Sequence, residues 1–301
     1  MFVSAAVAAA VLRPDFVAGT ASATPSAVDA RTGIGAEDGL GRPFAALEAR
    51  HGGRLGVFAF DSGTGARLEH RAHERFPMCS TFKAVLVGAV LENADAGRER
   101  LDRDVTYAAR DLLDYAPVTR ANFAHGSMTV RALCAAAIEE SDNTAANLLL
   151  RAVGGPARVT AFVRSLGDRK TRLDRIEPEL NAATAGDPRD TTTPAAMALT
   201  LHVLTTGSAL SPTSRKELVR WLRACRTGFD CLRAGLPRGW TAGDKTGSGA
   251  HGTRNDIAIL EPPGSRPPVF VAAYYTGSSA TPDERAAVLA SVGRIVSSTF
   301  A

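Results

Sequence analysis

The sequence predicts an α/β fold of the α+β sandwich type, in which an antiparallel five-stranded sheet with flanking helices is joined to an all-helical domain. Short alternating segments lie near both ends of the chain, long helical segments fill its middle, and a helical segment closes it. Strands separated by a run of helices are typical of a sheet that a helical insertion interrupts. The 301 residues, 45% of them hydrophobic, are enough to form a substantial core.

The first elements follow a linker that is rich in Gly, Ala and Thr. Residues 43–53 predict a short helix that ends at a glycine pair. Residues 54–76 alternate between apolar and polar side chains, which predicts a β-hairpin turned at residues 62–65. From Ser80 to Gly97, apolar residues recur at spacings of three and four and predict a long helix.

The middle and the end of the chain continue this order. Further helices are predicted over 129–140, 143–153, 156–167, 193–207 and 211–225. Residues 169–192 have no clear period and predict a long ordered loop. Strands are predicted again at 239–247, 253–263 and 268–277, before a last helix at 282–300.

These elements predict a division into domains. The expected parts are a signal peptide and linker at 1–30, an α/β domain made of 41–72 and 232–301, and an all-helical domain at 73–231 that includes a loop at about 172–190. A ligand site is expected at the seam between the two domains.

The N-terminus indicates export. The apolar run over residues 1–12 is too short to span a membrane, and Ala21-Ser22-Ala23 is a small-residue cleavage pattern. A disordered Ala-rich tail is the alternative. No later segment resembles a stop-transfer sequence, so we expect a secreted or periplasmic protein with no stable membrane association.

The charge distribution and the spacing of possible metal ligands argue against a nucleic-acid-binding protein and a metalloprotein. The net charge of +4 comes from Arg residues scattered among Asp and Glu, which argues against nucleic-acid binding. His70 and His73 have a loosely metal-like spacing, but a solvated pair on the hairpin is expected, and neither a metal nor a cofactor is predicted. The four cysteines are expected to be free and buried, although Cys225 and Cys231 could form a bridge.

The first chemical motif is Ser80-Thr81-Phe82-Lys83, at the start of a predicted helix. The i, i+3 spacing puts the hydroxyl and the amine on one face of the helix, and the helix N-terminus offers N–H groups for a developing oxyanion. A serine becomes a nucleophile when a nearby base takes its proton, and a buried lysine with a lowered pKa can help to do this. S-x-x-K alone is a weak signal.

Two further motifs follow in order. Ser141-Asp142-Asn143 lies between predicted helices, where S-D-N by itself is usually a helix cap. Lys245-Thr246-Gly247-Ser248-Gly249 lies on a predicted strand, where a lysine and two hydroxyls can form an anion subsite, although an ordinary strand and turn would also explain it. The order S-x-x-K, S-D-N and K-T-G is the pattern of class A β-lactamases and penicillin-binding proteins.

A fourth segment separates these two families. The residues from Arg175 to Asn181, R-I-E-P-E-L-N, resemble the Ω-loop of class A β-lactamases, in which the first Glu and the Asn hold the hydrolytic water. Transpeptidases lack this loop. The resemblance extends from about Pro43 to the C-terminus and includes the blocks RFPMCSTFK, SDNTAANLLL and GDKTGSG.

The resemblance implies catalytic roles for the matching residues. Ser80 is expected to be the nucleophile, Lys83 the neighbouring base or proton relay, and Ser141 the group that passes a proton to the departing ring nitrogen. Glu177 is expected to activate the deacylating water, which Asn181 fixes in place. Either Lys83 or Glu177 can be the base for acylation.

The resemblance also implies a substrate-binding set. The backbone N–H groups of Ser80 and Ser248 are expected to form the oxyanion hole, and Arg175 and Asp190 to pair across the neck of the loop. The residues expected to contact the substrate directly are Tyr115, Asn143, Lys245, Thr246, Ser248 and Arg254.

The expected activity is hydrolysis of penicillins and cephalosporins, which confers antibiotic resistance. We expect a monomer that binds the β-lactam substrate and no other partner. The serine at position 248 is a feature that this sequence shares with relatives that act on cephalosporins. Cys134 matches a position that is half of a disulfide in some relatives, but the matching partner position is Val87 here, so that disulfide should be absent. Gly249 likewise leaves Cys79 without the partner found in certain carbapenem-hydrolysing relatives, which makes carbapenem hydrolysis less expected.

Two alternatives share the predicted fold. One is a penicillin-binding DD-peptidase, and the other is a β-lactam sensor that stays acylated. The Glu177 and Asn181 pair argues against the DD-peptidase, and a sensor has no need of a water-activating Glu. A Ser-His-Asp hydrolase is not indicated, because the sequence has no G-x-S-x-G segment.

Overall fold

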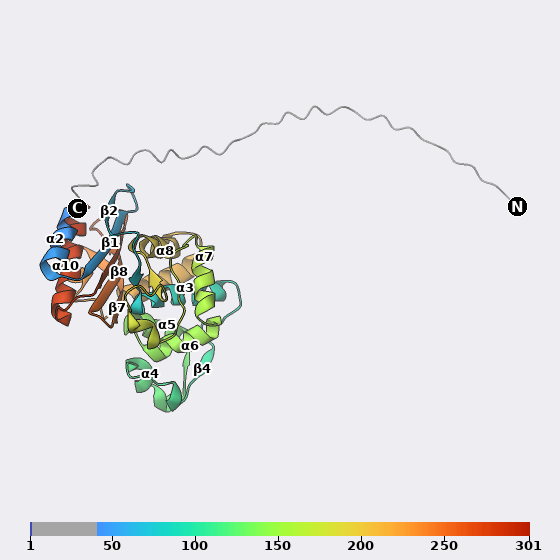
Figure 1. Ribbon diagram of the computed structural model, residues 1–301. Helices are drawn as coiled ribbons and strands as arrows, with labels where there is room; N and C mark the ends of the chain where they lie inside the picture. Colours follow the sequence, from blue (N-terminus) through green and yellow to red (C-terminus); the bar gives the residue numbers. More distant parts are fainter. Residues whose placement is uncertain (2–40) are drawn as a thin grey trace. The chain divides into compact units, whose positions relative to one another are not determined.

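A five-stranded antiparallel sheet with the order β2-β1-β9-β8-β7 confirms the predicted fold class (Figure 1). The computed structural model describes Met1 and residues 41–301, and the predicted signal peptide and linker lie outside these residues. The strands of the sheet are β1 (Arg54–Asp61), β2 (Arg67–His70), β7 (Thr241–Gly249), β8 (Thr253–Glu261) and β9 (Val269–Thr276).

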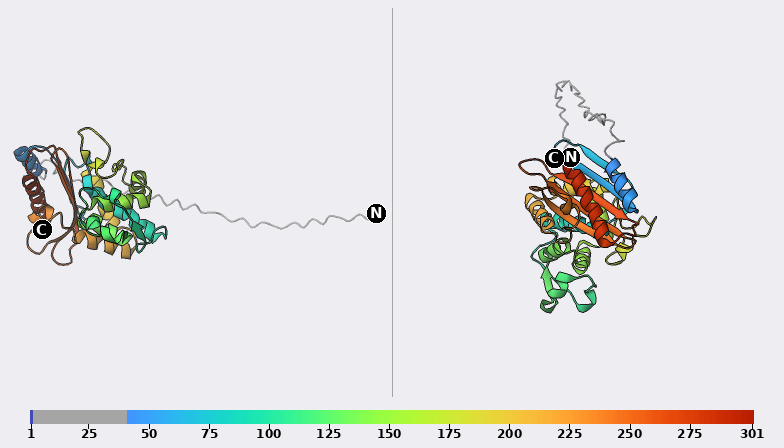
Figure 2. Two further views of the ribbon diagram at one scale, coloured as in Figure 1. Left: turned by 90° about the horizontal axis from the view of Figure 1, so that it is seen from below. Right: turned by 90° about the vertical axis from the view of Figure 1, so that its left-hand side faces the viewer.

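Helices cover both faces of this sheet, so its central strand β9 is buried along its whole length. Helices α2 (Arg42–His51) and α10 (Pro282–Thr299) cover one face, and α8 (Pro194–Thr206) packs on the other (Figure 2). Successive residues of β9 therefore join different cores: Val271 packs in the cluster that includes α10 residues, and Tyr274 in the cluster that includes α8 residues.

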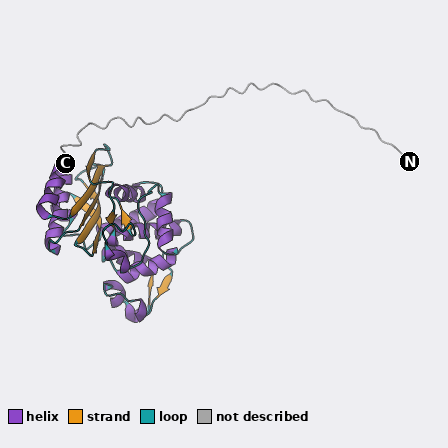
Figure 3. Cartoon of the chain, viewed as in Figure 1, coloured by secondary structure: helices purple, strands orange, loops and turns teal. Residues whose placement is uncertain are grey.

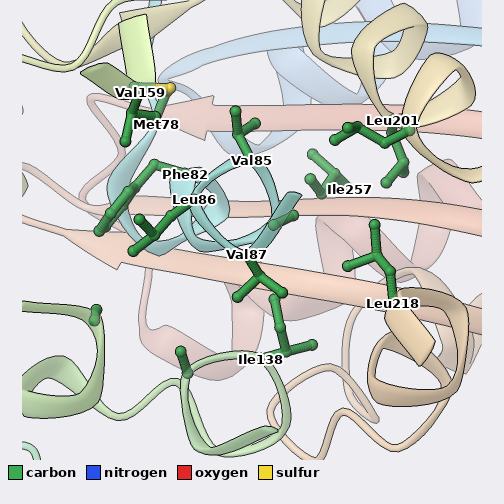
Figure 4. Close-up of a cluster of buried hydrophobic side chains, with 14 of the residues drawn as sticks. Met78, Phe82, Val85, Leu86, Val87, Ile138, Val159, Leu201, Leu218 and Ile257 are labelled. Atoms are coloured by element: carbon green, nitrogen blue, oxygen red, sulfur yellow. The ribbon is translucent and has the colours of Figure 1, made fainter. Parts of the chain in front are cut away.

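Helix α3 (Phe82–Asp95) is the centre of the helical part. Its residues 82–91 are all buried, including Lys83, so the helix is enclosed on every side and does not present one apolar face. Figure 4 shows Val85, Leu86 and Val87 pointing outward from α3 in different directions. The surrounding helices are α5 (Val130–Glu139), α6 (Asn143–Val153), α7 (Pro156–Ser165), α8 and α9 (Pro212–Arg223) (Figure 3).

Two parts of the chain differ from the prediction. The hairpin ends at His70, because Phe76–Pro77 forms a separate strand, β3, that pairs with β6 (Thr191–Thr192). Residues 104–129 contain several small elements that were not predicted. These elements are too short to produce a period in the sequence. They are β4 (Asp104–Thr106), which pairs with β5 (Ser127–Thr129), α4 (Pro117–Ala121), η2 (Ala109–Asp111) and η3 (Phe123–His125).

Residues 41–301 belong to one compact unit. Its predicted division into an α/β domain and a helical domain stays a prediction. Within these residues, no helix is long and apolar enough to cross a membrane.

Candidate active site

Ser80 lies in a short 3-10 helix, η1 (Cys79–Thr81), that runs directly into α3. Cys79 has φ 46°, a left-handed conformation that costs a non-glycine residue about 1–3 kcal/mol, so surrounding contacts must hold the turn. The side-chain amide of Asn255 in β8 donates to the carbonyl oxygens of the two residues before Cys79, at 2.8 and 3.1 Å. These contacts fix the turn before Ser80 to the sheet.

Lys83 is fully buried one turn further along α3. Its Nζ donates to the backbone oxygen of Ser141 at 2.8 Å and to Oδ1 of Asn143 at 2.6 Å, and it lies 3.0 Å from Oε1 of Glu177. Burial lowers the pKa of Lys83 because the charged form is desolvated, while the Glu177 carboxylate acts in the opposite direction. A lysine in this setting can exchange a proton with its neighbours.

Glu177 is buried, and its two carboxylate oxygens contact different partners. Oε1 accepts a hydrogen bond from the Ser80 hydroxyl at 3.3 Å, and Oε2 accepts one from Nδ2 of Asn181 at 2.5 Å. Asn181 Oδ1 is also buried and has no hydrogen-bond partner in the described part of the chain. A carboxylate oxygen and an amide acceptor therefore lie beside the predicted nucleophile.

The sequence analysis missed a residue of α6 that positions Glu177. Nδ2 of Asn147 donates to the Glu177 backbone oxygen at 2.8 Å, and the Glu177 N–H donates to Oδ1 of Asn147 at 3.0 Å. The available signal was a lone amide side chain in the run TAANLLL, which is otherwise nearly apolar. The hydrogen-bond pair fixes the backbone that carries the Glu177 carboxylate.

The Ser141 hydroxyl lies between two lysines. It accepts a hydrogen bond from Nζ of Lys245 at 3.0 Å, and Nζ of Lys83 lies 3.4 Å away. Burial lowers the pKa of Lys245 to about 8, and the nearby Lys83 cation also lowers it. Ser141 itself has φ 57°, so its hydroxyl is presented from a sparsely populated backbone conformation.

Strand β7 is an edge strand of the sheet, and it packs against η1. At Gly247, a Cβ atom would lie only 2.8 Å from the Met78 carbonyl oxygen and 3.1 Å from the Ser80 nitrogen. Only glycine permits this approach. The β7 backbone before Ser248 therefore borders Ser80 directly.

The outer part of β7 carries the predicted anion subsite. Ser248 is opposite Arg254 in the β7–β8 register, and Nη1 of Arg254 donates to the Ser248 hydroxyl at 2.9 Å. Nη2 of Arg254 donates to the backbone oxygen of Thr227 at 3.1 Å, and the Thr227 hydroxyl lies 2.5 Å from that of Thr246. Thr246, Ser248 and Arg254 thus form one connected group next to Lys245.

Tyr115 is the predicted site residue with the fewest contacts. Its side chain is half exposed, and its backbone oxygen accepts a hydrogen bond from the Asn143 N–H at 3.1 Å. The structure brings the Tyr115 backbone to the site, while its side chain stays open to solvent.

The Ω-loop is closed at its neck by Arg175 and Asp190. Nε of Arg175 lies 2.5 Å from Oδ2 of Asp190, whose side chain is almost fully buried. Oδ1 of Asp190 accepts hydrogen bonds from the N–H groups of Asp174 and Arg175 at 2.7 and 2.9 Å. The Asp190 backbone oxygen accepts from the Met78 N–H at 2.9 Å, which links the loop to the Ser80 turn.

Asp190→Asn should loosen this neck. The amide keeps the shape of the side chain but loses its charge, so we expect unfolding to become easier by about 2 kcal/mol, the value of a charge-assisted hydrogen bond. The resemblance assigns deacylation to Glu177, which this loop carries, so we expect deacylation to slow by about tenfold when Glu177 is less well positioned. Thermal unfolding, limited proteolysis of the loop and stopped-flow deacylation would measure these effects.

Asp187→Asn is the matched control, since Asp187 lies 3.9 Å from Arg175 and pairs mainly with Arg189. Equal effects of the two substitutions, or no effect of Asp190→Asn, would contradict the assigned role of the neck.

The histidines and cysteines form no further reactive cluster among residues 41–301. His70 lies 3.2 Å from Glu48 and His73 lies 3.6 Å from Glu69, and no group of three potential metal ligands occurs in this range. Cys79, Cys134, Cys225 and Cys231 are free and buried, as expected, so Cys225 and Cys231 are not bridged.

Comparisons with known proteins agree with this geometry. Residues 40–300 match the β-lactamase enzyme family. The chain is 53% identical over 252 residues to β-lactamase L2 of Stenotrophomonas maltophilia, covering 84% of this chain and 83% of the relative. It is 48% identical over 256 residues to β-lactamase CTX-M-8 of Citrobacter amalonaticus, covering 85% and 87%.

Solved structures give the same result. An ancestral class A β-lactamase of Gram-negative bacteria is 60% identical, with a TM-score of 0.85, and the match covers 87% of this chain and all of that one. The putative class A β-lactamase PenP of Rhodopseudomonas palustris is 55% identical, with a TM-score of 0.84 and coverage of 87% and 100%.

Proposed function

The chain belongs to the class A serine β-lactamases, and we propose that it opens the β-lactam ring through an acyl-enzyme on Ser80, which Glu177 deacylates. As a member of this family it hydrolyses β-lactam antibiotics and confers resistance to them. One observation carries the proposed mechanism: the Ser80 hydroxyl, the Lys83 ammonium and the Asn181 amide all meet at the buried Glu177 carboxylate.

Acylation begins with loss of the Ser80 proton. Oε1 of Glu177 accepts a hydrogen bond from the Ser80 hydroxyl and lies beside Nζ of Lys83. The Glu177 carboxylate can take the Ser80 proton directly, whereas Lys83 can take it only in its neutral form, after it has given its own proton to Glu177. The attack on the β-lactam carbonyl develops an oxyanion, for which the N–H groups of Ser80 and Ser248 are the proposed donors. The close approach of Gly247 to the Ser80 nitrogen supports this pairing.

Opening of the ring requires a proton on its nitrogen. Ser141 is the proposed donor, because its hydroxyl contacts Lys245 and can be resupplied with a proton through the Lys83 side. Asn143 is proposed to hold the amide side chain of the substrate with the part of its own amide that does not bind Lys83.

Deacylation requires a water molecule on the other side of the ester. Glu177 is the proposed general base for this water, and Asn181 Oδ1, a buried acceptor without a protein partner in residues 41–301, would orient it. This step distinguishes a hydrolase from a DD-peptidase or a sensor, whose acyl group waits for another acceptor or stays in place.

The substrate carboxylate is proposed to bind the group formed by Lys245, Thr246, Ser248 and Arg254, with Tyr115 as a wall of the cleft. The Lys245 ammonium favours an anion, and Arg254, whose Nη2 also pairs with Asp230 at 3.0 Å, adds a second cation beside it. Penicillins and cephalosporins both carry such a carboxylate, so we propose both as substrates.

The Lys245 subsite predicts a pH dependence. The pKa of Lys245 is lowered to about 8, so the cation that binds the substrate carboxylate is lost as the pH rises through this value. We therefore expect kcat/KM for benzylpenicillin to fall by up to about tenfold per pH unit above pH 8. Lys245→Arg should move this limb upward, because arginine stays protonated. An unchanged limb in the variant would assign the ionisation to another group.

Peptide mapping tests the acyl-enzyme assignment. Protein mixed with a slowly hydrolysed cephalosporin and quenched in acid should carry the added mass on the peptide that contains Ser80. A label on any other peptide, or none under conditions of active turnover, would overturn the proposed mechanism.

We further propose export and a monomeric state. The apolar run and the Ala21-Ser22-Ala23 pattern support secretion or delivery to the periplasm. The proposed site is assembled entirely from one chain, which supports a monomer.

A further inference from the structure

A cavity of about 990 Å³, called the loop cavity here, lies against the Ω-loop, and neither Ser80 nor Lys83 lines it. Its walls include residues 183–189 of the Ω-loop, the start of β1, the end of β9 and His251 in the turn between β7 and β8. None of the residues proposed to react with the substrate lines it. A volume of this size can hold a drug-sized ligand.

Four arginines line the loop cavity and place positive charges in its wall. Three of them already have carboxylate partners, while Arg75 has none among residues 41–301. The paired ones are Arg54 with Glu74 at 3.1 Å, Arg175 with Asp190 at 2.5 Å, and Arg189 with Asp187 at 2.7 Å. Arg75 is therefore the cation in this cavity whose charge is not neutralised by an adjacent carboxylate.

The Arg75 guanidinium is held in place through one nitrogen. Its Nη1 donates to the Lys170 backbone oxygen at 2.8 Å and to the Thr191 hydroxyl at 3.0 Å. Its Nε and Nη2 donate to no acceptor within residues 41–301. These two nitrogens form the fork that binds a carboxylate with two parallel hydrogen bonds.

Apolar side chains form much of the remaining wall. Pro77, Leu180, Ala183 and Pro188 all line the loop cavity. A ligand that uses the whole cavity must therefore combine an anionic group with an apolar body.

We propose that the loop cavity is a second binding site, for a small amphipathic carboxylate whose anionic group pairs with Arg75 and whose apolar body packs against Pro77 and Pro188. The site is independent of the proposed catalysis at Ser80. Leu180 adjoins Asn181, and the neck residue Arg175 also lines the cavity, so an occupant would contact the same loop that carries Glu177. Occupancy should therefore stabilise the Ω-loop.

Titration of octanoate into the full chain tests this site. Backbone amide signals of residues 183–189 and Gly277 should shift in a nitrogen-15 NMR spectrum, while those of Ser80 and Ser248 stay in place. Arg75→Gln should weaken binding by about tenfold or more, and Arg75→Lys, which keeps the charge, should weaken it less. Benzylpenicillin hydrolysis should be almost unchanged in both variants, which shows that they are folded, while the unfolding temperature of Arg75→Gln should fall slightly because the hydrogen bonds to Lys170 and Thr191 are lost.

Each part of the proposal can fail separately. Shifts confined to residues 245–254 would place octanoate in the catalytic cleft, and equal affinity in Arg75→Gln would remove Arg75 from the site. Octanol binding as tightly as octanoate would exclude anion recognition, and inorganic phosphate binding as tightly would exclude the apolar contact. None of these outcomes would affect the catalytic proposal, which is tested with Ser80 and Glu177 variants.

Discussion

Glu177→Ala should give a protein that benzylpenicillin acylates but that does not release the product. The variant loses the carboxylate that contacts Ser80, Lys83 and Asn181, and with it the proposed base for the deacylating water. A positioned general base contributes about 10²–10⁴-fold to a rate, so deacylation should slow by at least this range. Intact-protein mass spectrometry should show an added mass of one benzylpenicillin that persists for minutes or longer.

Glu179→Ala is the matched control, because Glu179 is exposed in the same loop and two residues away. Its acyl-enzyme should be released at nearly the rate of the unchanged protein. Glu177→Gln tests whether the effect of Glu177→Ala comes from a lost side chain or a lost carboxylate, since glutamine preserves the shape. Rapid return of both Glu177 variants to the native mass would mean that another group activates the water.

Ser80→Ala should abolish both turnover and covalent labelling. The substitution removes one oxygen atom from a residue that is 9% exposed, and it leaves the contacts of Asn255 with the preceding turn intact. Loss of a serine nucleophile lowers the rate by on the order of 10⁶-fold in a comparable hydrolase. A spectrophotometric assay with benzylpenicillin and mass spectrometry of the same sample would measure the two effects.

Ser141→Ala separates the nucleophile from the proposed proton donor. The variant should still form an acyl-enzyme, at a reduced rate, because Ser80 and Glu177 are unchanged. If Ser80→Ala retained a covalent adduct while Ser141→Ala lost it, the two assigned roles would have to be exchanged.

The sequence analysis succeeded for elements that depend on local spacing. Ser80 and Lys83 lie at the start of the predicted long helix, in η1 and α3, and residues 129–140 and 143–153 form α5 and α6 within a few residues of the predicted bounds. The resemblance to class A β-lactamases supplied the long-range partners. Ser80 and Glu177 are 97 positions apart, and no local rule connects them.

The sequence could not predict the residues that position the site through tertiary contacts. Asn147 fixes the Glu177 backbone and Asn255 fixes the turn before Ser80, but an amide in a helix or a strand has no periodic signal. The pairing of Phe76 with Thr192 was also missed, since a two-residue strand is defined by its partner and not by its own pattern. The burial of Lys83 was likewise not predictable, because it depends on the helices that enclose α3 on every side.

The most direct test of the catalytic account is the number of benzylpenicillin molecules that one enzyme molecule opens. Purified protein is mixed with a large excess of benzylpenicillin, and ring opening is followed by ultraviolet absorbance, with Ser80→Ala in parallel. The account predicts continued hydrolysis over many turnovers in the unchanged protein and none in the variant. A burst of about one equivalent that then stops would contradict it, because the acyl group would form on the protein without a functioning Glu177 to release it.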